Sequence, residues 1–553
     1  MSEKPNILWI STHDINPHLG AYAGVWPGAE HAITPNLDRL AAEGARFDQA
    51  MATAPVCAPS RASLYTGCQP TAIGTMHMRT RAVPPAEVVL LPELFREHGY
   101  YTTNNFFTDF QMEVPGTTFD EIGMDAHWRG RPDADTPFFA AFHGLITHES
   151  AIYLSDDEFA AATAHVTDEQ RHHPEAVELP PYYPDTEPFR IAWARYLDLI
   201  TEMDLWVGGI LDQLEEDGLA ENTIVVFWSD HGVGMPRAKR WANEAGVRVP
   251  LIVRWPDRIA AGTTIEDVVS LMDMAPTMLS LAGLPIPEHM HGTVAIDTTG
   301  ASTAANEYVF SGRDRMDEQQ DSSRTVRDKR FRYTRHRHPD RSGMQHHEYA
   351  DKFSTWAEFR RLAFEEANQL AVGETPSKMT PLQRAVVAAT KPVEELFDIF
   401  TDPHEERNLA NDPGHRDDLE RMRAALDGWH ERIDDLADMP EADLAASWRP
   451  GGIAAATAPV EITTDEDGRV HATCATPGAR IGWTTTPENS EPHPMAAHPM
   501  ARMMGVEPDG RDWQIYRGPL ETAGTVWLKA WRIGYTPSEA VMVELEDAVA
   551  VSA

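Results

Sequence analysis

The chain has 553 residues, of which 42% are hydrophobic and 24% are charged. Its 15 Trp, 19 Phe and 13 Tyr provide material for a large buried core, which excludes a wholly disordered chain. The length predicts two to four domains at about 150 residues each. Acidic residues number 86 and basic residues 47, and the formal charge of −39 disfavours nucleic acid and anionic membranes as partners.

The three cysteines, Cys57, Cys68 and Cys474, are too few for a disulfide framework, which fits a reducing compartment. The first residues do not combine a charged segment with a long apolar one. No run of about 18 or more apolar residues occurs in the chain. We therefore expect a cytoplasmic protein that does not span a membrane.

In chain order, the first predicted element is a short buried strand, Ile7–Ile10, which is followed by polar residues that include His13 and Asp14. A helix is predicted next, because Thr34 is a good N-cap and Pro35 suits the first helical position.

The clearest helical pattern is Ile200–Leu214, where apolar residues recur every three or four positions and Gly218 follows as a C-terminal glycine. A second wholly apolar strand, Thr223–Trp228, comes next and leads into Asp230 and His231. Helices that alternate with wholly apolar strands predict a mainly parallel α/β sheet flanked by helices. Sites in such sheets form at the carboxyl ends of the strands, so the polar residues after these two strands are expected to share one site.

Three patterns describe the rest of the chain. A basic strip from Arg324 to Arg337 alternates with apolar residues and predicts a strand of a smaller sheet rather than a nucleic-acid site. Residues 347–362 form an aromatic-rich amphipathic pattern, which indicates either core packing or an oligomer contact. The C-terminal segment has short alternating runs and predicts an all-β Ig-like module. We predict a catalytic domain at 1–305, an α+β subdomain at 306–447 with a helical insertion at about 340–390, and the β module at 448–553.

The most informative stretch is Val56–Gly67, which contains Cys57-Ala58-Pro59-Ser60-Arg61. A lone buried cysteine is often only a small hydrophobe. This string, however, resembles the C-x-P-S-R signature of type I sulfatases, a family of the alkaline-phosphatase-like superfamily in which the cysteine is oxidised to formylglycine. Further segments resemble motifs of that family in the same order, namely 5–14, 34–44, 222–232, 246–253 and 395–409. The resemblance implies a strand over 246–253.

The resemblance implies an alkaline-phosphatase-like fold and a sulfatase that hydrolyses sulfate monoesters of the aryl sulfate type. The implied metal ligands are His13, Asp14, modified Cys57, Asp230 and His231. Carboxylates and imidazoles suit a divalent cation, expected to be Ca²⁺ or Mn²⁺, that offsets the charge of the ester. An aldehyde hydrate at position 57 has one oxygen to attack sulfur and a second to drive release, whereas a thiol has a single such atom. Maturation therefore requires a formylglycine-generating enzyme as a partner.

The resemblance assigns four more roles. Arg61, one helical turn after the cysteine, is expected to contact the anion or steady the hydrate, the alternative being a surface salt bridge. Lys239 matches the lysine that contacts the anion or the leaving oxygen, the alternative being a solvated charge. His148 matches the general-acid histidine, the alternative being a capping or packing role. His77 and Asn105 lie near substrate-contact positions.

Two positions depart from the family pattern. Residue 13 is Asp in the family and His here, which reduces negative charge at the metal and favours Mn²⁺ or Zn²⁺, unless His13 lies outside the ligand set. The family's Lys-x-His motif is absent from 102–107. The pocket therefore carries less positive charge, and a phosphonate monoester hydrolase or phosphodiesterase is the alternative function. A non-catalytic binding protein is the third hypothesis.

The C-terminal module, which includes Ala475–Gly478 and Gly518–Tyr535, resembles the β domain of chitobiase-type glycosidases. Structural cover or an oligomer contact is favoured over glycan binding for this module. We expect a homo-oligomer that acts on a small anionic ester and binds neither nucleic acid nor membrane.

Overall fold

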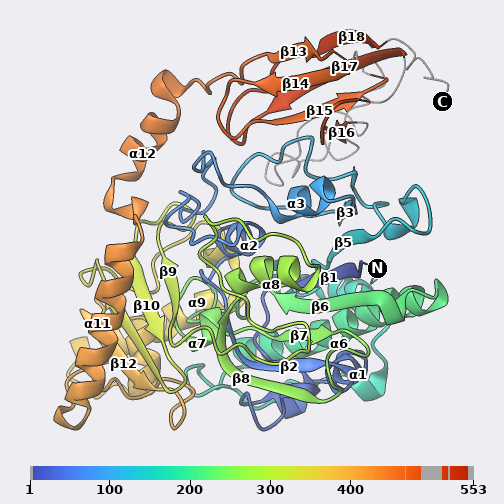
Figure 1. Ribbon diagram of the computed structural model, residues 1–553. Helices are drawn as coiled ribbons and strands as arrows, with labels where there is room; N and C mark the ends of the chain where they lie inside the picture. Colours follow the sequence, from blue (N-terminus) through green and yellow to red (C-terminus); the bar gives the residue numbers. More distant parts are fainter. Residues whose placement is uncertain (1–3, 467–468, 487–512, 521–523, 546–553) are drawn as a thin grey trace.

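The structure is a computed structural model that describes residues 4–466, 469–486, 513–520 and 524–545. It has a central α/β body, a smaller antiparallel sheet beside it and a β module at the C-terminal end (Figure 1). Parts of the predicted module at 448–553, namely 467–468, 487–512, 521–523 and 546–553, lie outside the described residues.

The central sheet has eight strands: β1 (Asn6–Thr12), β2 (Ala45–Met51), β3 (Tyr101–Asn105), β4 (Glu121–Ile122), β5 (Phe138–His143), β6 (Thr223–Ser229), β7 (Leu251–Arg254) and β8 (Thr263–Ser270). Their order is β4-β3-β5-β1-β6-β7-β2-β8. β1 pairs in parallel with β5 and β6, and β2 pairs in parallel with β8, whereas β7 runs antiparallel to both of its neighbours. The mainly parallel sheet predicted from the sequence is confirmed.

Helices cover both faces of this sheet, because its central strands are apolar on both sides. In β1, Ile7 and Trp9 pack into one core, and Leu8 and Ile10 pack into the other. The first core is covered by α2 (Cys57–Thr66), α3 (Leu91–Glu97) and α8 (Met274–Leu281), and the second by α1 (Pro35–Glu43), α6 (Glu187–Glu216) and α9 (Ser354–Ala371). Short helices α4 (Glu149–Ile152), α5 (Asp156–Ala162) and α7 (Glu244–Val247) complete the body. None of the described helices is long and apolar enough to cross a bilayer.

Most of the helices and strands expected from the sequence are present. α1 begins at Pro35, and α6 ends just before Gly218, which adopts a left-handed φ of 70°. The expectation of one strand over 246–253 is wrong, because this segment begins inside α7 and only its end belongs to β7. The side chain of Asn243 caps α7 by accepting a hydrogen bond from the Gly246 N–H, and this local bond favours a helical turn over an extended start.

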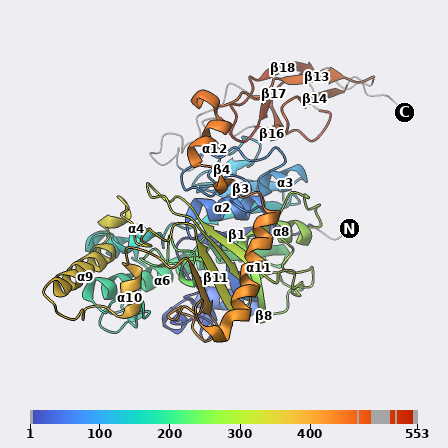
Figure 2. The ribbon, with the colours of Figure 1, turned by 90° about the vertical axis from the view of Figure 1, so that its left-hand side faces the viewer.

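The smaller sheet is antiparallel and has four strands: β9 (Val309–Arg313), β10 (Ser323–Arg327), β11 (Phe331–His336) and β12 (Glu394–Asp398). The basic strip expected as one strand forms the β10–β11 hairpin. Helix α11 (Arg416–Arg432) covers one face of this sheet through Leu419, Met422 and Leu426 (Figure 2).

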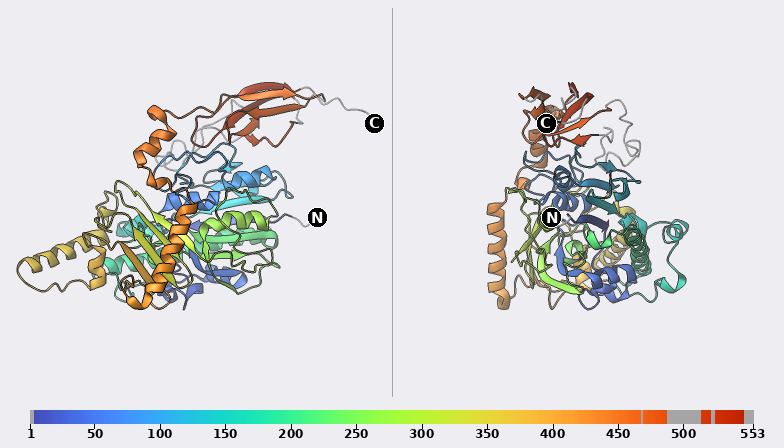
Figure 3. Two further views of the ribbon diagram at one scale, coloured as in Figure 1. Left: turned by 60° about the vertical axis from the view of Figure 1, so that its left-hand side comes forward. Right: turned by 45° about the vertical axis from the view of Figure 1, so that its right-hand side comes forward.

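The chain between β11 and β12 leaves the sheet and carries α9 and α10 (Pro381–Val386), which extend to one side of the molecule (Figure 3). Trp356, Phe359 and Leu362 of α9 are buried in the same core as α6. Core packing is therefore the correct interpretation of this amphipathic pattern.

The C-terminal β module follows α12 (Glu441–Trp448). Its described strands form two sheets, one of β13 (Val460–Thr464) and β14 (Val470–Cys474), and one of β15 (Arg480–Thr484), β16 (Gln514–Ile515), β17 (Gly524–Trp531) and β18 (Val541–Leu545). The module lies against the layer that holds α3 and β3 (Figure 1). The guanidinium of Arg96 donates to the Trp513 carbonyl at 2.6 Å, and that of Arg532 donates to the Pro84 carbonyl at 2.5 Å. These bonds attach the module to the central body.

Candidate active site

Two adjacent strands bring the first polar residues together. β1 and β6 pair in parallel, with Thr12 opposite Ser229, so the residues that follow each strand leave the same edge of the sheet. The Nδ1 of His13 lies 2.9 Å from Oδ2 of Asp230, and the Asp14 N–H donates to Oδ1 of Asp230 at 3.2 Å. Asp14 has a left-handed φ of 54°. All three side chains are fully buried.

Cys57 is the first residue of α2, and its side chain faces this cluster. Its Sγ lies 3.2 Å from Nε2 of His231 and 3.9 Å from Oδ1 of Asp14. Donor atoms of His13, Asp14, Cys57 and Asp230 all lie within 4.8 Å of one another. The N-terminal end of a helix favours negative charge, so the position of Cys57 suits an anion.

The Cys57 thiol itself is a poor nucleophile. Burial raises its pKa well above the ordinary value, and the carboxylates of Asp230 and Asp14 add to this effect against the opposing charge of Lys239. The thiol is therefore protonated at neutral pH, and the reactive thiolate is scarce.

Buried cations balance the two carboxylates. The Nζ of Lys239 lies 2.9 Å from Oδ2 of Asp14 and 2.9 Å from Oε1 of Glu149. Although burial opposes it, Lys239 and His231 hold the pKa of Asp14 well below its ordinary value. Burial also opposes the charged form of Lys239, but Asp14, Cys57 and Glu149 raise its pKa overall. The site therefore keeps a charged lysine beside a charged carboxylate.

Arg61 is fully buried, so its interpretation as a surface salt bridge is wrong. Its Nε donates to the Thr108 carbonyl at 2.8 Å and its Nη2 to the Phe107 carbonyl at 3.1 Å. Nη1 has no hydrogen-bond partner among the described residues. The guanidinium thus joins the first turn of α2 to the chain after β3, and it retains one unused donor.

His148 both caps a helix and borders the cluster. It is the N-cap of α4, where its side chain accepts from the Ser150 N–H, and its ring centroid lies 6.0 Å from that of His13. Burial and the nearby Lys239 lower the pKa of His148 to about 4. The neutral imidazole is therefore its resting form near pH 7.

The other two predicted site residues make their described contacts elsewhere. The Nδ1 of His77 accepts from the Arg315 N–H at 3.3 Å, while its Nε2 is buried without a partner among the described residues. The side-chain amide of Asn105 donates to the carbonyls of Met124 and Ala126. A substrate contact stays a prediction for both residues.

Three charged residues at the site were not singled out from the sequence. Glu149 accepts from the guanidinium of Arg240 at 2.9 and 3.0 Å and from Lys239, and its neighbour His148 was the available signal. Asp109 lies in an otherwise aromatic stretch, and burial raises its pKa against the opposing charge of Arg61. An acid within an apolar run was the signal for Asp109.

Comparisons with known proteins agree on one family. A model of the sulfatase family matches residues 5–284, and a model of the N-sulphoglucosamine sulphohydrolase C-terminal region matches residues 235–347. An ulvan-active sulfatase from Formosa agariphila is 34% identical over 587 aligned positions, which cover 99% of this chain and 92% of that protein.

Solved structures show the same fold. A protein in complex with its substrate D-glucosamine-2-N,6-O-disulfate is 17% identical, with a TM-score of 0.54 over 79% of this chain and 99% of the other. A phosphonate monoester hydrolase from Silicibacter pomeroyi is 18% identical, with a TM-score of 0.51 over 85% of this chain and 99% of the other. At these identities the likeness concerns the fold alone.

Proposed function

This chain belongs to the sulfatase family, and we propose that it hydrolyses sulfate monoesters carried on a polysaccharide, with position 57 as a formylglycine. The class of enzyme is sulfuric ester hydrolase. One observation carries the proposal: the first residue of a buried helix, Cys57, faces His13, Asp14, Asp230 and His231 within one cluster.

The donor set fits a divalent cation. Two carboxylates and two imidazoles converge on position 57, and these oxygen and nitrogen donors suit Mn²⁺ or Ca²⁺. The second nitrogen of His13 has no partner among the described residues, which leaves it available to a metal. His13, Asp14, Asp230, His231 and the modified residue 57 would hold the ion. When present, the ion offsets the charge of the ester, and a hydrated aldehyde supplies two oxygens on one carbon.

The chain's own residues then have distinct tasks. Lys239 keeps a positive charge 2.9 Å from Asp14 and attracts the sulfate group. Glu149 and Arg240 fix the position of that lysine through the ion pairs described above. Arg61 holds the first turn of α2 against the 107–108 backbone and keeps Nη1 for an anion. His148, which is neutral near pH 7, donates a hydrogen bond to the leaving oxygen as negative charge develops there.

The Formosa agariphila relative supports a polysaccharide substrate. Its alignment covers 99% of this chain, and it is named an ulvan-active sulfatase. Hydrolysis of aryl sulfates stays a prediction. A small aryl sulfate ester tests the chemistry of hydrolysis without the polymer. Phosphonate monoesters stay the alternative, because the site lacks the cations of a Lys-x-His motif. Cytoplasmic location, homo-oligomer formation and maturation by a formylglycine-generating enzyme also stay predictions.

The test uses purified protein whose Cys57 peptide is examined by mass spectrometry. We expect an aldehyde in place of the thiol, and release of sulfate from ulvan oligosaccharides in proportion to the modified fraction. A chelator should abolish this release, and added Mn²⁺ or Ca²⁺ should restore it. Matched aryl sulfate and aryl phosphonate esters then compare kcat/KM for the two anions. Fully modified protein that releases sulfate from none of these esters contradicts the proposal.

A further inference from the structure

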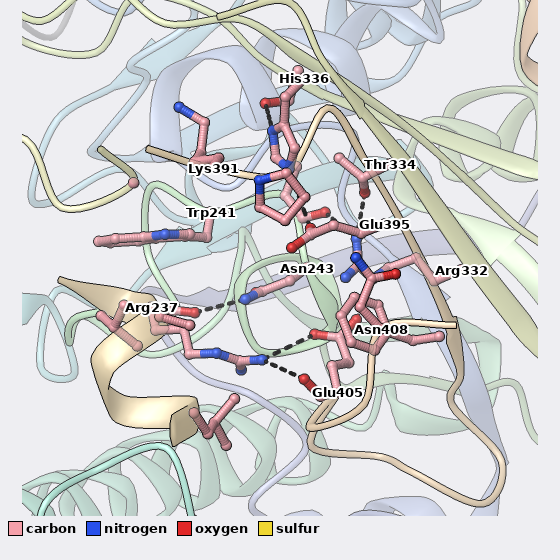
Figure 4. Close-up of a pocket in the computed structure, with 18 of the residues that line it drawn as sticks. Arg237, Trp241, Asn243, Arg332, Thr334, His336, Lys391, Glu395, Glu405 and Asn408 are labelled. Carbon is pink, nitrogen blue, oxygen red and sulfur yellow. Dashed lines mark hydrogen bonds and ion pairs between the residues drawn. The ribbon is translucent and has the colours of Figure 1, made fainter. Parts of the chain in front are cut away.

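A cavity of about 290 Å³ lies outside the cluster around Cys57. It forms where three parts of the fold meet: the 237–243 segment after β6, the antiparallel sheet, and α10 of the insertion (Figure 4). None of the residues that line it belongs to the proposed metal site or contains the nucleophile. The cavity is therefore a separate candidate site.

One wall of the cavity is apolar. It consists of Trp241 and residues of α10, among them Leu382 and Val386. The indole of Trp241 is held by the ring of Trp356 at a centroid distance of 5.7 Å and by the guanidinium of Arg313 at 5.9 Å. An aromatic ring fixed in this way offers a flat apolar surface at low entropic cost.

The opposite wall is polar. Glu395 pairs with Nε2 of His336 at 3.2 Å, and Nδ1 of that ring pairs with the Ser323 hydroxyl at 2.9 Å. Figure 4 draws Glu395 and His336 together on the side of the cavity opposite Arg237. Fixed polar groups facing an apolar surface are the usual composition of a small-molecule site.

Two buried cations among the residues that line the cavity have donors without a partner among the described residues. Arg237 is 8% exposed, and its Nη2 donates to the carbonyls of His404 and Glu405, whereas its Nη1 has no partner among the described residues. Arg313 is 3% exposed, and its Nε is also without a partner there. Buried polar groups are normally hydrogen-bonded, so these two residues of the lining carry donors that the described protein atoms do not satisfy.

The charges that line the cavity are balanced. The cations are Arg237, Arg313, Arg332 and Lys391, and the anions are Asp321, Glu395, Glu405 and Glu406. A balanced lining gives no net attraction to a strongly charged ligand. It suits hydroxyl groups, because each hydroxyl both donates to a carboxylate and accepts from a guanidinium.

We propose that this cavity binds a single uncharged sugar ring of the polysaccharide, with one face of the ring on Trp241 and its hydroxyls on Glu395 and Arg237. The proposal rests on the proposed function, because a polysaccharide sulfatase meets saccharide chains. The volume of about 290 Å³ lies just below the roughly 300–1,000 Å³ typical of small-molecule sites, which suits one ring rather than a chain. The cavity shares the 237–241 segment with Lys239, so bound polymer is held beside the catalytic cluster.

The test blocks the cavity without touching the catalytic site. Ala385 is exposed and lines the cavity, so A385W fills its mouth, whereas the exposed Ala389 does not line it and A389W is the matched control. A second variant, E395Q, removes an acceptor charge with little change in volume. Each is made in the full-length chain with Cys57→Ala to prevent turnover, and binding of desulfated ulvan oligosaccharides is measured by isothermal titration calorimetry.

We expect A385W and E395Q each to weaken binding at least tenfold and A389W to bind like the parent. Equal affinity in the parent, A385W and E395Q overturns the proposal, as does the absence of any binding to the parent. Circular dichroism melting confirms that each variant is folded. Because the readout is binding of a desulfated probe, its failure is distinct from a failure of sulfate ester hydrolysis in the modified wild-type protein.

Discussion

At the scale of single residues, Cys57 lies where a nucleophile is expected, but its thiol is protonated and therefore unreactive. It stands at the first turn of a helix and 3.2 Å from an imidazole, yet burial and two carboxylates keep its thiol protonated. Cys68 is also buried, but it packs in a hydrophobic core, and among the described residues its Sγ donates to the backbone carbonyls of Thr66 and His289. The same residue type therefore has two different roles, and the environment decides between them.

Replacing Cys57 by Ala should reduce kcat/KM for a soluble sulfate ester by roughly 10³-fold or more, because the nucleophile is removed. Stability should change by only about 1 kcal/mol, since both side chains are small. Cys68→Ala is the matched control and should keep full activity. Activity assays with thermal melts check both variants, and an active Cys57→Ala protein would remove position 57 from the mechanism.

His18 shows how a buried imidazole links stability to pH. Its Nε2 accepts from the indole N–H of Trp26 at 3.1 Å, and its Nδ1 pairs with the Tyr196 hydroxyl at 2.9 Å. Protonation of the neutral ring at Nε2 would place two N–H donors, those of His18 and the Trp26 indole, against each other. Burial lowers the pKa of His18 from 6.5 to about 3, so between these values the unfolded chain binds more protons than the folded one.

The stabilising contribution of neutral His18 should be complete above about pH 6.5 and should fall as the pH decreases toward 3. The slope for one proton is about 1.4 kcal/mol per pH unit. His18→Gln should flatten the pH dependence of the unfolding free energy, measured by denaturant titration. His346→Gln, at an exposed histidine, is the control. Identical slopes in the two variants would rule out this linkage.

At the scale of elements, α6 packs closely against α1 at one of two adjacent glycines. A Cβ atom at Gly208 would lie 2.7 Å from the side-chain amide of Asn36, which is held by hydrogen bonds to Asp204. Gly209 faces open space. The sequence shows two equivalent glycines within a helix, and the packing distinguishes them.

Gly208→Ala should destabilise the protein by about 1–2 kcal/mol, because the clash outweighs the gain in helix propensity. Gly209→Ala should stabilise it by about 0.5–1 kcal/mol, since alanine restricts the unfolded chain and favours the helix. Equilibrium unfolding in urea measures both. Changes of the same sign in the two variants would contradict this view of the α1–α6 contact.

At the scale of the whole molecule, buried ion pairs join the antiparallel sheet to the central body. Arg327 of β10 donates to Glu244 of α7 at 3.0 Å, and Arg332 of β11 pairs with Glu405. All four side chains are almost fully buried. The charge of the basic β10–β11 hairpin is therefore neutralised inside the protein. Arg332 and Glu405 also line the cavity described above.

Glu244→Gln should destabilise the molecule by about 3–5 kcal/mol, because it leaves Arg327 buried without its charged partner. The control is Lys329→Gln in the same hairpin. Lys329 pairs with Asp267 at 2.5 Å, but its side chain is 59% exposed, so a loss of at most about 1 kcal/mol is expected. Chemical unfolding of the full-length chain checks both, and equal losses would show that burial does not set the strength of these pairs.

Several local features were predicted from neighbouring residues, such as the start of α1, but not all of their bonds were. Thr34 occupies the N-cap position of α1 as expected, but its hydroxyl accepts from the Gly20 N–H and donates to Asp38, so it makes no cap bond to α1. The charge of the basic strip was visible in the sequence, whereas its partners were not, since Glu244 lies about 80 residues before the strip and Glu405 about 70 residues after it.

The amino-acid sequence by itself determined the two apolar strands, the polar residues at their carboxyl ends and the signature around Cys57, because each depends on residues close together in the chain. Only the tertiary structure decided that Glu149 and Arg240 support Lys239, that Arg61 is buried against the 107–108 backbone, and that α10 encloses a cavity. These contacts join segments far apart in sequence, so their energies depend on packing that no local pattern records.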